Sequence, residues 1–272
     1  MANNHIAGAA ARTFAPSELC QRMLAKTSKG TCGPCILYLE DGTIFYGRAC
    51  GAEGTATGEV CFNTSLEGYF EVMTDPSYAG QIVTMTYPQI GNYGIDETDV
   101  QSAFPGDAVR PASAPAMRGM IVRDMCATPS NWRSAVSVPE YLRAHGIVAI
   151  EGVDTRALVR HLRDNGSKMG IISTEIFDVD VLAERLAAAP TLVGENLVKT
   201  VSCPVPHEFV AADLPATHDF ALTAAAPARH KVVAYDCGVK RGILEGLVRA
   251  GCDLTVVPWD TPASEVLDMN PD

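Results

Sequence analysis

Residues 231–260 constrain the fold more than any other segment, because they contain one complete strand–helix–strand pattern. The run VVAYD lacks polar alternation, as is typical of a parallel strand covered on both faces. Gly251 marks the end of the helix, and DLTVVPWD predicts the second strand. Thr261 and Pro262 then predict the cap and first position of another helix. Because two parallel strands cannot bury a sheet alone, we expect the start of an α/β domain that is truncated at Asp272.

The preceding part of the chain is rich in strand signals. Residues 36–49 predict a hairpin, because two apolar runs flank Asp41-Gly42, a pair that tolerates the positive φ of a type I′ turn. Residues 58–94 continue with short strands between turn residues, and residues 116–125 predict a further strand.

Three helices are predicted after these strands. Ser137 is the expected cap of VPEYLRAHG, and Gly146 is its left-handed stop. Asp154 is the expected cap of TRALVRHLRDNG, which Gly166 ends. Residues 179–189 predict the third helix, which a proline closes.

The pattern divides the chain into four regions. Residues 1–34 read as an N-terminal extension, which we expect to be disordered, and residues 35–203 as a mixed, strand-rich domain. Residues 204–229 carry four prolines without periodicity, which favours a linker over a core element. Residues 230–272 are the truncated α/β start. The expected fold class is therefore α/β, with a mixed domain followed by an incomplete parallel one.

Composition excludes some classes of function. The net charge of −11 disfavours binding to nucleic acid through its phosphates. No apolar run approaches the roughly 18 residues of a membrane span, so no membrane role is expected. The nine cysteines are scattered without framework spacing, which fits a reducing compartment and predicts a cytoplasmic protein.

Two cysteine positions are candidates for chemistry. CGPC, from Cys32 to Cys35, matches the thioredoxin tetrapeptide, but a polar loop precedes it and a strand follows, where that site needs a helix. Cys237 follows a predicted parallel strand, where α/β proteins place their sites, yet no histidine lies near it in sequence. We expect CGPC to have no redox role and Cys237 to be a buried loop thiol.

Other short patterns exclude further sites. The six histidines are isolated and no second C-x-x-C exists, so no metal site is expected; His161 reads as a helix-surface or half-buried residue. No phosphate-binding glycine pattern follows the strand at 232–236. From the residues alone, no complete catalytic constellation emerges.

Longer segments resemble a known family. The run LEDGTIFYGRACGAEGTATGEVCFNTSLEGYFEVMTDPSYAGQIVTMTYPQIGNYG is similar to the N-terminal domain of the carbamoyl phosphate synthetase small subunit. The likeness continues through GMIVRDM, SNWR and YLRAHGIVAIEGVDTRALVRHLRDNGSKMGII, and then through residues 231–272. It covers nearly everything from residue 35 onward, with many motifs in the same order.

The resemblance implies a fold and an activity. The fold would be a β/β/α domain of the swivelling type, followed by the start of a flavodoxin-like class I amidotransferase domain. The complete small subunit would hydrolyse glutamine with a Cys nucleophile activated by His and Glu. Its ammonia would pass to a large subunit, which binds ATP and magnesium and makes carbamoyl phosphate from bicarbonate for pyrimidine and arginine synthesis. No cofactor is expected on this chain.

The resemblance also implies one ligand contact. Ser77, in the motif TDPSY, would touch glutamine from across the domain boundary. A structural reading applies as well, because Asp75 and Pro76 suit the first two positions of a turn in which a serine hydroxyl bonds its own backbone. Both readings can hold together.

The chain departs from the family at its end. The family's nucleophile elbow, G-x-C-x-G, and the later His and Glu have no counterpart in residues 1–272. We therefore expect no catalytic residue in this chain and no glutaminase activity from it alone. The alternative is a non-enzymatic docking or scaffold subunit that pairs with a separate glutaminase chain. A reading frame that continues past codon 272 into such an elbow would favour the enzyme.

Overall fold

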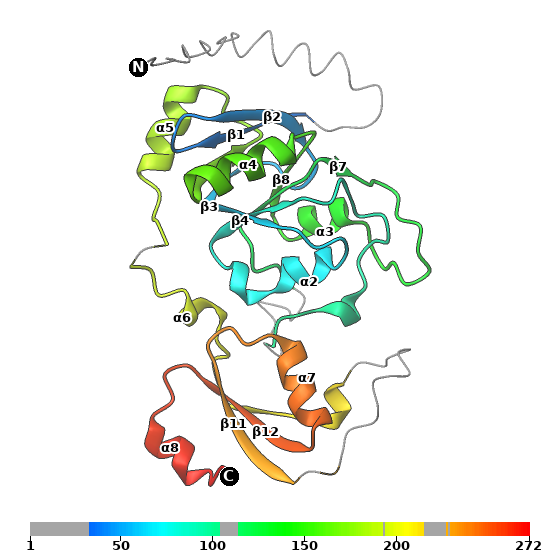
Figure 1. Cartoon of the computed structure of the whole chain (residues 1–272), viewed down its shortest axis with the longest axis vertical. Coiled ribbons are helices and arrows are strands. Elements are labelled where there is room, and N and C mark those ends of the chain that lie inside the picture. Colours follow the sequence, from blue (N-terminus) through cyan, green and yellow to red (C-terminus); the bar gives the residue numbers. More distant parts are fainter. Residues whose placement is uncertain (1–32, 104–113, 193, 215–226, 228) are drawn as a thin grey trace, which may run out of the picture.

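The computed structural model describes residues 33–103, 114–192, 194–214, 227 and 229–272 (Figure 1). Two units follow each other along the described chain, a strand-rich barrel and a smaller three-stranded sheet. In Figure 1 the sheet lies below the barrel, on the side of helix α2 (Tyr69–Thr74). Among the described residues, every helix is too short or too polar to cross a membrane.

The first unit is a closed barrel. In the order in which they pair, its described strands are β1 (Pro34–Leu39), β2 (Ile44–Ala49), β8 (Val148–Glu151), β6 (Gly119–Ile121), β4 (Gln81–Met85), β3 (Thr55–Asn63) and β9 (Lys168–Ser173). Strands β3, β4, β6 and β8 run parallel to their neighbours within this group. Strand β9 pairs antiparallel with both β1 and β3, and this double pairing closes the barrel.

Helices cover the barrel. They are α2, α3 (Val138–Ala144), α4 (Thr155–Asn165) and α5 (Val179–Ala187), and α6 (Val198–Val201) leads on to the second unit. The buried residues on one face of the strands form a single cluster with α4, which includes Leu37, Val60, Ile82, Ile150, Leu158, Leu162 and Ile172. On the other face, α5 packs Leu182 and Leu186 against Ile36 of β1. Strand β1 is therefore buried on both faces, as its apolar run ILYL requires.

The first hairpin forms as predicted, but its turn is different. Strands β1 and β2 pair antiparallel, and the Leu39 amide donates to the Thr43 carbonyl at 2.9 Å. Gly42 has a φ of 85°, whereas Asp41 is not among the residues with positive φ. A type I′ turn needs positive φ at both central residues, so the prediction of the turn type is wrong. A three-residue loop with one left-handed glycine makes this connection.

Other expectations hold in part. Residues 69–74 form helix α2, where short strands were predicted, because Tyr69, Phe70 and Met73 share one buried face at helical spacing. The predicted strand at 116–125 is divided into β6 and β7 (Asp124–Met125), and β7 pairs with β5 (Gln89–Ile90).

The predicted helix caps of the barrel unit are confirmed. Ser137 and Glu140 make a capping box at the start of α3, and the Asp154 carboxylate accepts from the Ala157 amide at the start of α4. Glycines in the left-handed region follow both helices, as expected.

The second unit contains the predicted strand–helix–strand pattern and one strand that was not predicted. Strand β11 (His230–Asp236), helix α7 (Arg241–Arg249) and strand β12 (Cys252–Pro258) form the parallel pair. Strand β10 (His207–Phe209) pairs antiparallel with the other edge of β12, and Phe209 is buried. The expectation of no core element between 204 and 229 is thus wrong for β10. The domain boundaries themselves stay a prediction.

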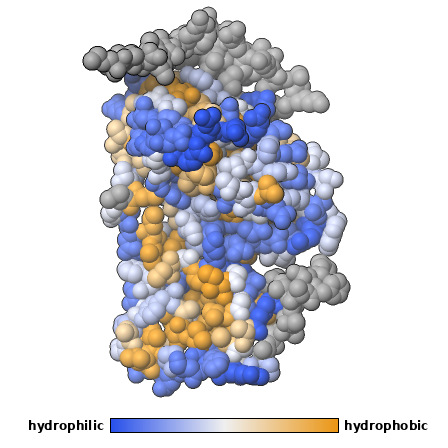
Figure 2. All heavy atoms as spheres, viewed as in Figure 1, coloured by the Kyte–Doolittle hydropathy of each residue, from blue (hydrophilic) through white to orange (hydrophobic). Residues whose placement is uncertain are grey.

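The last helix differs by one residue from its prediction. Helix α8 (Ala263–Asp268) has Pro262 at its N-cap, so Thr261 lies outside the cap position. Figure 2 shows hydrophobic side chains gathered over the lower part of the molecule, where this unit lies. The exposed large hydrophobic residues from position 205 onward are Val205, Val210, Tyr235, Ile243 and Leu267. Helix α7 packs on β12. In β11 only Asp236 is buried, so the described residues cover this α/β sheet only in part.

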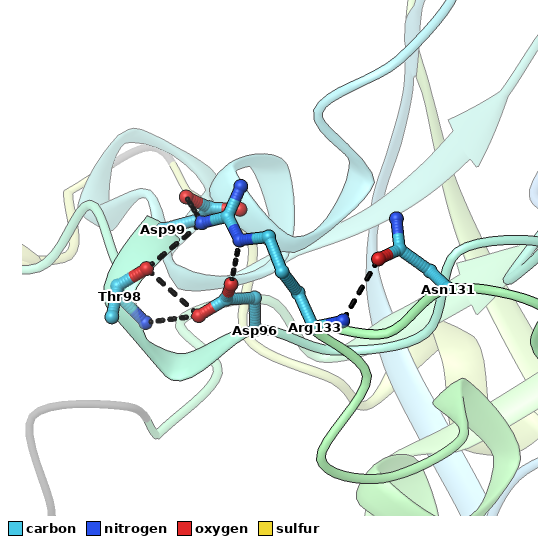
Figure 3. A network of polar contacts seen from close by, with 5 residues as sticks. All are labelled: Asp96, Thr98, Asp99, Asn131 and Arg133. Atoms are coloured by element: carbon cyan, nitrogen blue, oxygen red, sulfur yellow. Dashed lines mark hydrogen bonds and ion pairs between the residues drawn. The ribbon is translucent and has the colours of Figure 1, made fainter. Parts of the chain in front are cut away.

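A polar network fixes the loop before α3 to a 3-10 turn at Glu97–Asp99 (Figure 3). The Arg133 guanidinium forms an ion pair with Asp96, and it bonds Thr98 Oγ1 at 3.0 Å and Asp99 Oδ1 at 3.2 Å. The Arg133 amide also donates to Asn131 Oδ1 at 2.9 Å. Burial alone would raise the pKa of Asp96, but hydrogen bonds from Thr98 and the charge of Arg133 hold that pKa below its usual range.

Substituting Asp96 by asparagine is expected to lower the urea midpoint at pH 7. Because the folded pKa of Asp96 lies below its unfolded value of about 3.9, the carboxylate stabilises the fold above that value and loses its effect as the pH falls through the folded pKa. The difference in urea midpoint between wild type and Asp96→Asn should therefore become smaller as the pH falls from about 5 to about 3. Urea titrations across this range test it, with Asp268→Asn on exposed α8 as control. A difference in urea midpoint that stays constant over this pH range would contradict the lowered pKa of Asp96.

Candidate functional site

The loop that contains Ser77 follows α2 and is built on Asp75. The Asp75 carboxylate accepts from the Ser77 amide at 2.9 Å, and its carbonyl accepts from the Tyr78 amide at 3.1 Å. Pro76 stands at the second position of this turn, as the sequence predicts. The backbone of Ser77 is thus held in place, while its side chain is exposed. The hydroxyl faces solvent from a fixed position.

The start of this loop is anchored from the other side. Thr74 is fully buried, and its hydroxyl donates to the Phe70 carbonyl at 3.0 Å and accepts from the Gln101 amide at 2.9 Å. Asp75 is also buried, with 4% of its surface exposed. A buried carboxylate needs hydrogen bonds and a counter-charge to stay ionised.

The counter-charge comes from the second unit. Lys240 Nζ lies 2.6 Å from Asp75 Oδ2, and this ion pair joins the Ser77 loop to the connection between β11 and α7. Backbone contacts support it, because the Arg241 amide donates to the Gln101 carbonyl at 2.8 Å and Ser102 forms an antiparallel bridge with Lys240. The ion pair therefore belongs to an ordered contact between the two units.

The connection between β11 and α7 is held by a second buried carboxylate. Asp236 is 1% exposed; its Oδ1 accepts from the amides of Gly238 and Val239, both at 3.0 Å. Its Oδ2 accepts from the Cys203 amide at 2.7 Å, which ties the end of the barrel unit to the same loop. The carboxylate fixes the loop at the carboxyl end of β11, where α/β proteins place their sites.

Gly238 shows how closely the two loops approach. Its φ is 91°, and a Cβ atom there would lie 3.0 Å from Val201 Cγ2 and 3.4 Å from Pro76 Cβ. A side chain at this position would therefore strain the backbone and press on the Ser77 loop. The glycine allows the loops of Pro76 and of Cys237 to contact each other.

The structure places the other sequence candidates as follows. Cys237 is exposed beside Gly238, so the expectation of a buried loop thiol is wrong: the turn after β11 leaves its side chain at the surface. Cys35 is buried in β1, where burial raises the pKa of its thiol to about 12. A thiol with that pKa is not a nucleophile at neutral pH. Cys32 lies outside the described residues. His161 bonds Asp41 at the first hairpin with 2.6 Å between Nε2 and Oδ2, so it is part of a surface contact. Across the described residues, no three His, Cys, Asp or Glu side chains form a group that could hold a metal ion.

Sequence reasoning missed three residues of this site, Asp75 as an ion-pair partner, Lys240 and Asp236. The motif TDPSY identified the turn, but nothing in it names a partner 165 residues further on, which is the separation of Lys240 from Asp75. Asp236 ends an apolar strand, and an acidic residue at that place is a signal for a loop-capping role.

Comparison with known proteins gives a family. Residues 37–172 match the family model described as carbamoyl-phosphate synthase small chain, CPSase domain. The chain is 51% identical over 237 residues to the carbamoyl phosphate synthase small chain of Syntrophotalea carbinolica, covering 87% of this chain and 60% of that protein. It is 48% identical over 240 residues to that of Thermosynechococcus vestitus, covering 88% and 60%.

A third relative matches a similar part of the chain at lower identity. The chain is 46% identical over 244 residues to the carbamoyl phosphate synthase small chain of Yersinia pestis, covering 87% of this chain and 59% of that protein. The chain thus spans about 60% of the length of the curated relatives it matches. Among solved structures, an aminopeptidase from Aneurinibacillus sp. strain AM-1 aligns with 13% identity over 58% of this chain and 37% of its own, and its TM-score of 0.29 is too low to bear on the fold.

Proposed function

Because the chain belongs to the carbamoyl-phosphate synthase small chain family, we propose that it acts in the small, glutamine amidotransferase subunit of that enzyme. In this role the subunit hydrolyses glutamine and delivers ammonia to a large subunit. The large subunit binds ATP and magnesium and makes carbamoyl phosphate from bicarbonate. We place the complex in the cytoplasm, in pyrimidine and arginine synthesis.

One observation supports this role above the others. The ion pair between Asp75 and Lys240 holds the Ser77 loop of the barrel unit against the carboxyl end of β11 in the second unit. An exposed hydroxyl at such a place can both donate to and accept from the amide or carboxylate of a small ligand. We assign Ser77 to contact glutamine from across the boundary between the two units.

The chemical step needs groups that we place outside residues 1–272. Glutamine hydrolysis by a thiolate passes through a thioester that water then cleaves, and it needs a base beside the nucleophile. Among the described residues no histidine bonds a cysteine, and Cys237 lies in a loop without such a base. We therefore expect the purified 272-residue chain to release no ammonia from glutamine. Glutamine-dependent ammonia from this chain would refute that expectation.

The role of Ser77 is tested in the assembled enzyme. The reading frame is followed past codon 272, the longer small chain is combined with its large chain, and Ser77→Ala is compared with wild type. Loss of one hydrogen bond to glutamine should raise the KM for glutamine about tenfold. The rate with ammonium chloride as nitrogen source should not change, because that reaction bypasses the glutamine site.

Ser167→Ala is the control, because Ser167 is an exposed serine directly before β9, where its hydroxyl donates to Glu59 Oε1. An unchanged KM for Ser77→Ala would remove Ser77 from the site and leave the subunit role standing. The docking-subunit alternative would be favoured by two results together. The reading frame would stop at codon 272, and ammonia would form only when a separate glutaminase chain is added.

A further inference from the structure

The barrel unit contains a cavity of about 440 Å³. It lies where β1 begins and where β2 and β9 end, and the last turn of α3 adds one side. Its lining includes Gly33 and Cys50 at the strand ends and three charged side chains, those of Glu53, Arg143 and Glu175. Pockets that bind small molecules have volumes of about 300–1,000 Å³, so this cavity is large enough for a small ligand.

Backbone hydrogen bonds fix the walls of this cavity. The Ala49 amide donates to the Gly33 carbonyl at 2.9 Å, which joins the end of β2 to the start of β1. Between β3 and β9, the Gly54 amide donates to Thr174 Oγ1 at 2.9 Å, and the Thr174 amide donates to the Gly54 carbonyl at 3.0 Å. The cavity is therefore formed before a ligand enters it, which lowers the entropic cost of binding.

The bonded pair of Gly54 and Thr174 brings two carboxylates to the cavity. Glu53 directly precedes Gly54 and Glu175 directly follows Thr174, and both glutamates are exposed and line the cavity. Among the side chains that the structure describes, neither glutamate has an ion-pair partner. Two carboxylates that share one site repel each other, and a cation bound between them relieves this repulsion. The two glutamates therefore favour a ligand with an ammonium group.

Arg143 brings the opposite charge to the same cavity. It lies in the last turn of α3, and no described carboxylate forms an ion pair with its guanidinium. Glu140, one turn earlier, is held by Ser137 with 2.6 Å between Glu140 Oε2 and Ser137 Oγ. A guanidinium binds a carboxylate through two parallel hydrogen bonds. Because Arg143 pairs with neither glutamate of the cavity, space for a ligand remains between the opposite charges.

We propose that this cavity binds a free α-amino acid, with the carboxylate of the ligand on Arg143 and its ammonium between Glu53 and Glu175. An ammonium has three N–H donors, so both glutamates can accept from it. A simple anion would meet two carboxylates and a simple cation would meet a guanidinium, so a zwitterion is the class of ligand that suits all three side chains. The proposal is independent of the role of Ser77, because no residue of the loop 75–78 lines the cavity.

Isothermal titration of the 272-residue chain with glycine, L-serine, L-leucine and L-lysine tests the proposal, because these ligands span small, polar, apolar and charged side chains. At least one should bind, and Arg143→Ala should weaken its Kd about 10- to 100-fold, as loss of a hydrogen bond to a charged group does. Arg143→Lys should be intermediate, because lysine keeps the charge without the planar fork. Arg160→Ala, at an exposed arginine on α4, is the matched control and should leave the Kd unchanged.

A second variant separates recognition of the ammonium from a change of fold. Glu175→Gln should weaken binding of the amino acid but strengthen binding of the deaminated acid, because it removes a repelling charge, whereas a misfolded cavity would weaken both. In the wild type, the deaminated acid and the decarboxylated amine should each bind at least about tenfold more weakly than the amino acid. Equal binding of the acid, or of the amine, would assign the cavity to simple ions and overturn the proposal. No binding of any of the amino acids at millimolar concentration would overturn it as well.

Discussion

Asp236→Ala is expected to lower the free energy of unfolding by about 3 kcal/mol. The carboxylate is buried and accepts three backbone amides, those of Cys203, Gly238 and Val239. Alanine leaves these donors without an acceptor in a place with little access to water, and a lost bond to a charged acceptor costs about 1.5–3 kcal/mol. The loss should loosen the connection between β11 and α7 first, because two of the three amides belong to it.

Urea unfolding of the 272-residue chain measures this effect. Asp236→Asn should lie between wild type and Asp236→Ala, because one side-chain oxygen remains to accept the loop amides while the amide group cannot accept from Cys203. Asp253→Ala, an exposed aspartate on β12, is the control and should change stability by less than about 0.5 kcal/mol. Equal stability of Asp236→Ala and Asp253→Ala would show that the three bonds contribute nothing.

Gly47→Ala is expected to destabilise the barrel by about 3 kcal/mol. A Cβ atom at this position of β2 would lie 2.2 Å from the Glu151 carbonyl oxygen and 2.6 Å from Ile150 Cγ1. The oxygen belongs to the backbone of β8, so it cannot move away as a flexible side chain could. The contact between β2 and β8 has only two paired positions, and a shift there opens the barrel wall.

The matched control is Gly33→Ala at the beginning of the same hairpin. A Cβ atom at Gly33 meets nothing within 4 Å, so this change should be close to neutral. Thermal unfolding followed by circular dichroism should give a clearly lower Tm for Gly47→Ala alone. Similar Tm values for the two variants would show that the close approach of β2 and β8 at Gly47 does not exclude a Cβ atom there.

Local structure was predictable wherever neighbouring residues decide it. The side chains of Ser137 and Asp154 cap their helices by accepting from amides three positions later. Donor and acceptor lie within one turn of each other in sequence, so these caps could be predicted. The turn at Asp75 and Pro76 is of the same kind. The type of the first hairpin turn was not predictable from Asp41-Gly42, because a loop longer by one residue uses the same glycine.

Contacts between distant segments could not be derived in this way. Strand β10 has no apolar alternation of its own and is ordered because β12 offers an open edge. The partner of Asp75 depends on how the second unit lies against the barrel, which no local pattern records. The candidate site was thus identified by resemblance at Ser77, whereas the two carboxylates that hold it became evident from packing.

The double pairing of β9 sets an order of events during synthesis. Strand β1 pairs with β9 at residues 170–173, which follow β1 by more than 130 residues in the chain. A ribosome adds about 5–20 residues each second, so the first hairpin waits several seconds with an unpaired edge. Contacts of such sequence separation also make folding slow. The edge of β1 that pairs with β9 therefore stays open until Ser173 has been synthesised.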